Sequence, residues 1–153
     1  GSRGSVVPLF LRQRKDGVLT VTDMRMTRFW MTIEQGVRFV ISNIELMHGG
    51  EIFVPKIPSM RITDLAQALA PECKLKVTGV RPGEKLHEVL LTEDEARRTR
   101  AFDEFFVIEP EYAFKGDMHW TGGKPVLEGF RYTSDENDEW LTPASLRKMV
   151  DVE

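Results

Sequence analysis

The segment from Thr32 to Gly50 constrains the fold of this 153-residue chain more than any other. Thr32, with Gln35 three residues later, predicts a capping box at the start of a helix. The apolar residues that follow share one face at a period of 3.6 residues, and they are Ile33, Val37, Val40, Ile41, Ile44 and Met47. Gly49 and Gly50 predict a left-handed cap at the end of this helix. Because helical stability comes mainly from packing of such a face, the face must be buried against other structure.

The rest of the chain predicts short helices and short strands, so the expected fold class is mixed α/β. Capping residues and periodicity predict helices over residues 5–14, 64–70, 93–100 and 143–150, and strands over residues 18–22, 51–55, 74–80 and 105–108. Thr63 and Thr92 are the expected N-caps of the second and third of these helices. Residues 112–129, rich in Gly, Lys and Asp, predict a long surface loop.

These few strands leave two alternatives for the apolar face of residues 33–47. Either they form a small sheet of their own that covers the face, or the face packs on a sheet outside this chain. Residues 1–5 contain no starting strand, and the residues alone do not decide between the two alternatives. On the second alternative we expect that the chain alone will not melt as a compact, cooperative monomer.

Charge and cysteine content exclude several classes of protein. Lys and Arg number 21 against 24 Asp and Glu, which gives a net charge of −3 and disfavours a broad electrostatic grip on nucleic acid or anionic membrane. No apolar run approaches the ~20 residues of a transmembrane helix. The single cysteine, Cys73, cannot form an internal disulfide. We therefore expect a cytoplasmic protein that binds neither nucleic acid nor membranes.

Catalytic motifs are absent from the sequence. There is no G-x-G-x-x-G fingerprint, no Walker A sequence, no G-x-S-x-G elbow and no Tyr-x-x-x-Lys pair. The three histidines lie far apart and have no ligand at zinc spacing. We therefore predict no catalytic residue and no metal site. For His87, a hydrogen-bonded side chain near a turn is favoured over a proton shuttle.

Two segments in the first third of the chain suit a nucleotide. Residues 1–5, Gly-Ser-Arg-Gly-Ser, directly precede a predicted helix, where small residues let backbone N–H groups approach a phosphate. Taken alone, this pattern favours a flexible start of the chain. In residues 22–32, Arg25 and Arg28 alternate with Met and aromatic residues, which suits a diphosphate clamp or single-stranded nucleic acid. The competing reading is a strand with apolar side chains facing the core and arginines facing solvent.

A third segment, residues 79–88, follows a predicted strand. Pro82 and Gly83 form a turn between Arg81 and Glu84, at the carboxyl end of the strand, where α/β folds bind ligands. Arginine suits a phosphate and glutamate suits ribose hydroxyls. A local ion pair that caps the turn is the alternative, and the spacing does not decide between the two.

In this order, these segments resemble the inverting UDP-N-acetylglucosamine 4,6-dehydratases, a PseB-type, CapD-like branch of the extended short-chain dehydrogenase/reductase family. The resemblance runs from Gly1 to about Leu146. Its motifs are Ser2-Arg3-Gly4-Ser5-Val6-Val7-Pro8, Thr22-Asp23 with Arg25-Met26-Thr27-Arg28-Phe29-Trp30, Gly49-Gly50-Glu51-Ile52-Phe53-Val54-Pro55-Lys56-Ile57-Pro58-Ser59-Met60 and Arg81-Pro82-Gly83-Glu84-Lys85-Leu86-His87-Glu88. The Arg-Pro-Gly-Glu-Lys turn is also shared with related retaining dehydratases.

The resemblance implies that residues 1–153 are one C-terminal, substrate-binding portion of a Rossmann-type enzyme whose N-terminal, dinucleotide-binding half is absent. In the family, bound NADP takes hydride from C4, water leaves across C5–C6 with inversion at C5, and hydride returns to C6. The absent half would carry the catalytic Tyr and Lys and most NADP contacts, so the chain alone is expected to be inactive. UDP-N-acetylglucosamine as substrate, a homo-oligomer and a role in pseudaminic acid or surface polysaccharide biosynthesis are implied in the same way.

By the same resemblance, a small set of residues is expected to contact cofactor and substrate. The cofactor-contacting residues are Gly1, Ser2 and Arg3, and the substrate-binding residues are Val6 and Thr22 along the UDP-sugar, Arg81 and Arg28 on phosphate, and Glu84 on the ribose. The alternative function is a non-catalytic nucleic-acid-binding or assembly module that uses residues 25–30. Tight, steeply salt-dependent binding to a single-stranded oligonucleotide would support that alternative.

Overall fold

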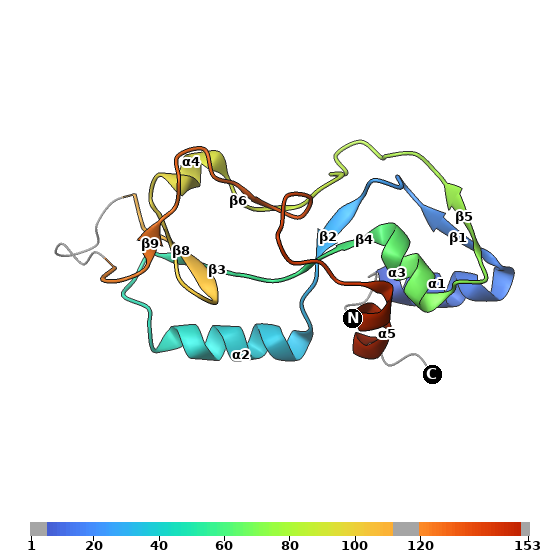
Figure 1. Cartoon of the computed structure of the whole chain (residues 1–153), viewed down its shortest axis with the longest axis horizontal. Helices are drawn as coiled ribbons and strands as arrows, with labels where there is room; N and C mark the ends of the chain where they lie inside the picture. The colour runs from blue at the N-terminus through green and yellow to red at the C-terminus, as the bar shows by residue number, and fades with distance from the viewer. Residues whose placement is uncertain (1–5, 112–119, 151–153) are drawn as a thin grey trace. The chain divides into compact units, whose positions relative to one another are not determined.

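The computed structural model describes residues 6–111 and 120–150, and the chain divides into two compact units (Figure 1). Unit 1 comprises Gly1–Trp30, Pro58–Glu88 and Ser134–Glu153, and unit 2 comprises Met31–Ile57 and Val89–Thr133. Each unit is therefore assembled from segments that are far apart in the sequence.

Unit 1 combines three helices with two pairs of strands. Its elements are α1 (Val6–Gln13), the 3-10 helix η1 (Arg14–Asp16), β1 (Val18–Val21), β2 (Thr27–Phe29), β4 (Ser59–Arg61), α3 (Ile62–Leu69), β5 (Lys74–Val77) and α5 (Pro143–Met149). Strand β1 pairs with β5 in parallel, and β2 pairs with β4 antiparallel. Because β1 and β5 run in parallel, their carboxyl ends lie at the same edge, so the residues after them come close together.

The core of unit 1 lies between its helices and β1. Helix α3 contacts both α1 and α5, and α1 also contacts β1. Leu19 of β1, Leu65 of α3 and Leu146 of α5 are fully buried in one cluster of apolar side chains. This core fixes the position of β1, from which the loop that carries Thr22 emerges.

Unit 2 is an antiparallel sheet with a cluster of aromatic side chains. Its elements are α2 (Ile33–Ile44), β3 (Ile52–Pro55), β6 (Val89–Leu91), α4 (Glu93–Ala96), β7 (Thr99–Ala101), β8 (Phe105–Ile108), β9 (Lys124–Pro125) and β10 (Tyr132–Thr133). The four-stranded sheet has the order β3-β8-β7-β9, and β6 pairs with β10. Phe53 and Phe102 each pack against both Phe105 and Trp120, with ring centroids 5.0–5.8 Å apart.

The apolar face of α2, together with Met47 three residues past the helix end, is exposed among the described residues and is called the α2 face below. Its exposed fractions are 71% for Ile33, 52% for Val37, 59% for Val40, 61% for Ile41, 59% for Ile44 and 56% for Met47. The helix contacts its own unit through another side, where Asn43 is buried and the Phe39 ring meets Phe105 edge-on at 6.4 Å. The strands of this chain therefore do not cover the α2 face, and a contiguous apolar patch of this kind marks an interaction surface.

The predicted class, mixed α/β with short helices and short strands, is confirmed. The two predicted capping boxes form, at Thr32–Gln35 and at Thr92–Glu95. The helix predicted over residues 143–150 starts with Thr142 as its N-cap, and the structure adds a third capping box there, between Thr142 and Ser145. Among the described residues, no helix is long and apolar enough to cross a membrane.

Three predicted helix boundaries are wrong. Helix α2 ends at Ile44 with Glu45 as its C-cap, and not at the glycine pair, where the N–H groups of His48 and Gly49 donate to the Glu51 carboxylate. Helix α3 begins one residue before Thr63, so Thr63 lies inside it. Residues 99 and 100, predicted as the end of a helix, belong instead to β7, because β7 pairs with β8.

Candidate functional site

A cavity of about 640 Å³ in unit 1 is the candidate functional site. It is lined by residues of α1, β1 and β2 and by the segments that follow β1 and β5. All five residues predicted to bind substrate line this one cavity, and they are Val6, Thr22, Arg28, Arg81 and Glu84. The three residues predicted to contact the cofactor, Gly1, Ser2 and Arg3, lie outside the described residues.

The parallel pairing of β1 and β5 brings two of these segments together. Pairing continues past the strand ends, since the N–H of Thr78 donates to Val21 O at 2.9 Å and that of Gly79 to Thr22 O at 3.1 Å. The chain then turns at Gly83, whose φ of +82° suits glycine, and the N–H of Glu84 donates to Arg81 O at 3.0 Å. This pairing joins positions that are 57 residues apart in the sequence.

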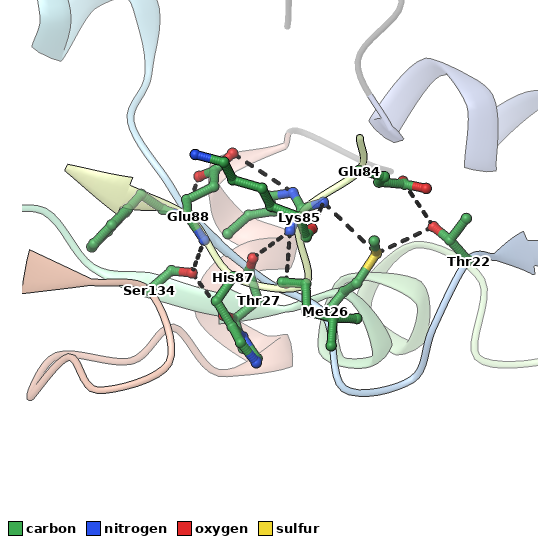
Figure 2. A network of polar contacts seen from close by, with 11 residues as sticks. Thr22, Met26, Thr27, Glu84, Lys85, His87, Glu88 and Ser134 are labelled. Atoms are coloured by element: carbon green, nitrogen blue, oxygen red, sulfur yellow. Dashed lines mark hydrogen bonds and ion pairs between the residues drawn. The ribbon is translucent and has the colours of Figure 1, made fainter. Parts of the chain in front are cut away.

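The Glu84 carboxylate holds this turn. Its Oε1 accepts from the Thr22 hydroxyl at 3.1 Å (Figure 2). Its Oε2 accepts from the backbone N–H of Arg81 at 3.1 Å. The predicted alternative of an Arg81–Glu84 ion pair is wrong, because the contact is to the Arg81 backbone. The exposed Arg81 guanidinium makes no hydrogen bond or ion pair to the described residues, so it is available to an anion.

Arg28 is placed differently from Arg81. Its Nη1 donates to Thr27 O at 2.7 Å and Leu86 O at 2.9 Å, and its Nη2 donates to Lys85 O at 3.1 Å. Its Nε lies 3.6 Å from Glu88 Oε1, and the side chain is only 22% exposed. Arg28 therefore lines the cavity but directs its donors to protein carbonyls.

Thr27, the residue before Arg28 in β2, belongs to a buried network of hydroxyl groups. The Thr27 hydroxyl, in a residue only 4% exposed, lies 2.8 Å from His87 Nδ1 and 2.7 Å from Ser134 Oγ (Figure 2). Ser134 Oγ also accepts from the N–H of Glu88 at 2.8 Å. The prediction of a hydrogen-bonded His87 beside a turn is confirmed.

The alternative prediction for residues 22–32, a strand in place of a clamp for phosphate or nucleic acid, is confirmed in part. Thr27–Phe29 form β2, and neither arginine of the segment is unpaired. Arg25 forms a bidentate pair with Asp23, from Nε to Oδ1 at 3.0 Å and from Nη2 to Oδ2 at 2.8 Å. This segment therefore offers little free positive charge to nucleic acid.

The Arg25 pair sets the ionisation of Asp23. Hydrogen bonds from the side chain and then from the backbone N–H of Arg25 lower the pKa of Asp23 from 3.8 to about 2. A lowered folded-state pKa stabilises the turn above the unfolded value, and this contribution is lost as pH falls through about 2.

We expect Arg25→Gln to move the pKa of Asp23 back toward 3.8, because the side-chain hydrogen bonds are its largest cause. The measurement is a carboxyl ¹³C NMR titration of Asp23 between pH 1.5 and 6. Arg38→Gln, which breaks an exposed pair with Glu34 on α2, is the matched control and should leave Asp23 unchanged. An Asp23 pKa that stays near 2 in Arg25→Gln would contradict this account.

The lining of the cavity suits binding more than proton transfer. Its charged residues are Arg28, Arg81, Glu84 and Glu88, and its described lining contains no Tyr, Lys, His or Cys. Among the described residues, no three His, Cys, Asp or Glu side chains gather as a metal site. The cavity is also lined by Trp30, Thr78 and Glu88, which were not predicted as site residues. Trp30 and Glu88 belong to the motifs shared with the dehydratases.

Comparisons with known proteins were made over the whole chain. A family model described as polysaccharide biosynthesis protein matches residues 1–110. Two proteins of Campylobacter jejuni named UDP-N-acetylglucosamine 4,6-dehydratase (inverting) are each 47% identical, over 98% and 99% of this chain. The capsular polysaccharide biosynthesis protein CapD of Staphylococcus aureus is 38% identical over 77% of this chain and 21% of its own length.

A solved structure also matches. The X-ray structure of Pen from Bacillus thuringiensis has a TM-score of 0.79 and 32% identity, over 98% of this chain and 45% of that one. The expected portion of an extended short-chain dehydrogenase fold is therefore confirmed. The chain spans 48% and 47% of the two Campylobacter proteins, about half their length.

Proposed function

The chain belongs to the polysaccharide biosynthesis protein family, and from this premise we propose that it is the substrate-binding portion of an inverting UDP-N-acetylglucosamine 4,6-dehydratase. The observation that carries the proposal is the 47% identity, over nearly the whole chain, to two proteins of that name. The complete protein would remove water across C5–C6 of the sugar, in nucleotide-sugar metabolism that leads to pseudaminic acid or a surface polysaccharide.

The cavity of unit 1 is the proposed UDP-sugar site. Arg81 would bind the diphosphate, since its guanidinium has five donors and no partner among the described residues. Glu84 would accept from the ribose hydroxyls, because each carboxylate oxygen holds one donor and can accept another. Thr22 and Val6 would line the path of the ligand.

NADP is proposed as cofactor of the complete protein. The described residues do not themselves fit a dinucleotide, because no glycine-rich turn among them opens a helix. We therefore propose that residues beyond this chain make most contacts to NADP and supply the catalytic Tyr and Lys. The chain's own residues bind and orient the UDP-sugar.

A dinucleotide-binding half that contacts unit 2 is also part of the proposal. The two dehydratases are about twice as long as this chain, and the α2 face exposes six apolar side chains. The proposed occupant of that face is the rest of the same polypeptide, and the complete protein is proposed to form a homo-oligomer.

The proposed function is tested by product analysis with UDP-N-acetylglucosamine and NADP. We expect the complete protein to form a 4-keto-6-deoxy sugar nucleotide and the 153-residue chain to form none. The absence of this product from the folded complete protein would overturn the proposed activity. Its formation by the chain alone would overturn the division of roles.

A further inference from the structure

We infer that Arg28 is a positioning residue of the UDP-sugar site, which holds the segment Lys85–Glu88 in place, and that it does not bind phosphate. The inference rests on the proposed function of the cavity. It reassigns the second phosphate arginine that the sequence predicts. Three observations carry it: the use of the donors of Arg28, the irregular backbone of the segment, and the position of that segment beside Glu84.

Both Nη atoms of the Arg28 guanidinium donate hydrogen bonds within the protein, and its Nε forms a longer ion pair. Nη1 is shared between two backbone carbonyls at 2.7 and 2.9 Å, and Nη2 lies 3.1 Å from Lys85 O and 3.7 Å from Met26 Sδ. Nε faces Glu88 Oε1 at 3.6 Å. An arginine has five N–H donors, so a phosphate would have to displace one of these partners. By contrast, none of the described residues accepts a hydrogen bond from the Arg81 side chain, so its donors are available to a ligand.

The segment that Arg28 holds has no strand of its own. Residues 85–88 lie beside β2 but form no ladder with it. One backbone bond joins them, from the N–H of Thr27 to Leu86 O at 3.1 Å. The Arg28 guanidinium adds bonds to Lys85 O and Leu86 O, and so supplies the donors that a second strand would have supplied.

Side chains further along the segment form a second anchor. Figure 2 shows His87, Glu88 and Ser134 gathered around Thr27. The N–H of Phe29 also donates to Glu88 Oε2 at 3.0 Å. Loss of Arg28 would therefore free Lys85 and Leu86, next to Glu84, while His87 and Glu88 stay fixed by this second anchor.

The freed end is the one that matters for binding. Glu84 directly precedes Lys85, and it is Glu84 that fixes both Thr22 and the backbone of Arg81. A shift of Lys85 and Leu86 would displace the proposed ribose acceptor and the proposed phosphate ligand together. A direct phosphate contact, in contrast, would matter only for ligands that carry phosphate.

The test compares uridine with UDP in the complete protein. Affinities are measured by NMR competition for wild type, Arg28→Gln, Arg28→Lys and the control Arg14→Gln, which breaks an exposed pair with Glu72 outside the cavity. We expect both Arg28 variants to weaken uridine and UDP by the same factor, at least about tenfold, the scale of a lost charge-assisted hydrogen bond. Lys does not rescue, because one ammonium cannot reach three carbonyls with the geometry of a guanidinium. Amide exchange should accelerate within residues 84–88.

Three outcomes would overturn the inference. The first is a loss confined to UDP, with uridine affinity unchanged, which would make Arg28 a phosphate ligand. The second is wild-type affinity in both variants. The third is a fall in melting temperature with exchange accelerated throughout unit 1 in both variants, which would make Arg28 a folding residue only. Wild-type protein that binds neither uridine nor UDP would instead refute the proposed function.

Discussion

Replacement of Arg81 by alanine is expected to weaken binding of UDP to the complete protein by about 2 kcal/mol, or about 30-fold in Kd. The Arg81 side chain is exposed, lines the cavity and donates no hydrogen bond to the described residues. Its removal costs a charge-assisted contact to the diphosphate without breaking an internal one. The melting temperature should therefore stay close to that of wild type.

Titration calorimetry at ~0.15 M salt measures this effect, because screening at that ionic strength leaves close contacts largely intact. Arg14→Ala is the matched control, since it removes an arginine from the same unit at a pair that does not line the cavity. Uridine, which lacks phosphate, should bind the Arg81→Ala variant nearly as well as wild type. Unchanged UDP affinity would exclude Arg81 as the phosphate ligand.

The second large effect is expected at the exposed face of α2. Ile41→Asp should destabilise the complete protein by about 3–5 kcal/mol, the cost of an unpaired charge in a buried contact. If nothing covered this face, the same change would alter the stability of the complete protein by less than about 0.5 kcal/mol, because Ile41 is 61% exposed within this chain. Denaturant unfolding of the complete protein therefore reports whether the rest of the polypeptide buries the face.

Ser42→Asp is the control for this experiment. Ser42 neighbours Ile41 on α2 but lies on the opposite side of the helix from the apolar face, and it is exposed. Ser42→Asp should leave the denaturant midpoint of the complete protein close to that of wild type. If Ile41→Asp leaves the complete protein as stable as wild type, the face is not covered, and the proposed contact with a dinucleotide-binding half fails.

Local signals predicted the elements whose causes are local. Thr32 and Thr92 form the predicted capping boxes, because such a box depends on residues three positions apart. Strand 105–108 was likewise evident from its apolar run. The strand at residues 99–101 was not evident from the sequence, because its pairing with β8 is a tertiary contact that overrides helix propensity.

In the candidate site too, the features with local causes were predictable from the sequence and those that depend on tertiary contacts were not. The turn at Pro82 and Gly83 predicted where Arg81 and Glu84 would lie, since turn chemistry is readable from sequence. The resemblance added Val6 and Thr22, which line the same cavity. The surroundings of Arg28 were not predictable, because its partners are backbone carbonyls almost 60 residues away, and carbonyls carry no sequence signal.

The central claim, that the cavity of unit 1 binds the UDP-sugar, is tested most directly by a crystal structure of the complete protein with UDP bound. The account predicts diphosphate oxygens within hydrogen-bond distance of the Arg81 guanidinium and ribose hydroxyls at the Glu84 carboxylate. It also predicts that Arg28 keeps its bonds to the carbonyls of Lys85 and Leu86. UDP bound away from Arg81 and Glu84 would contradict the claim.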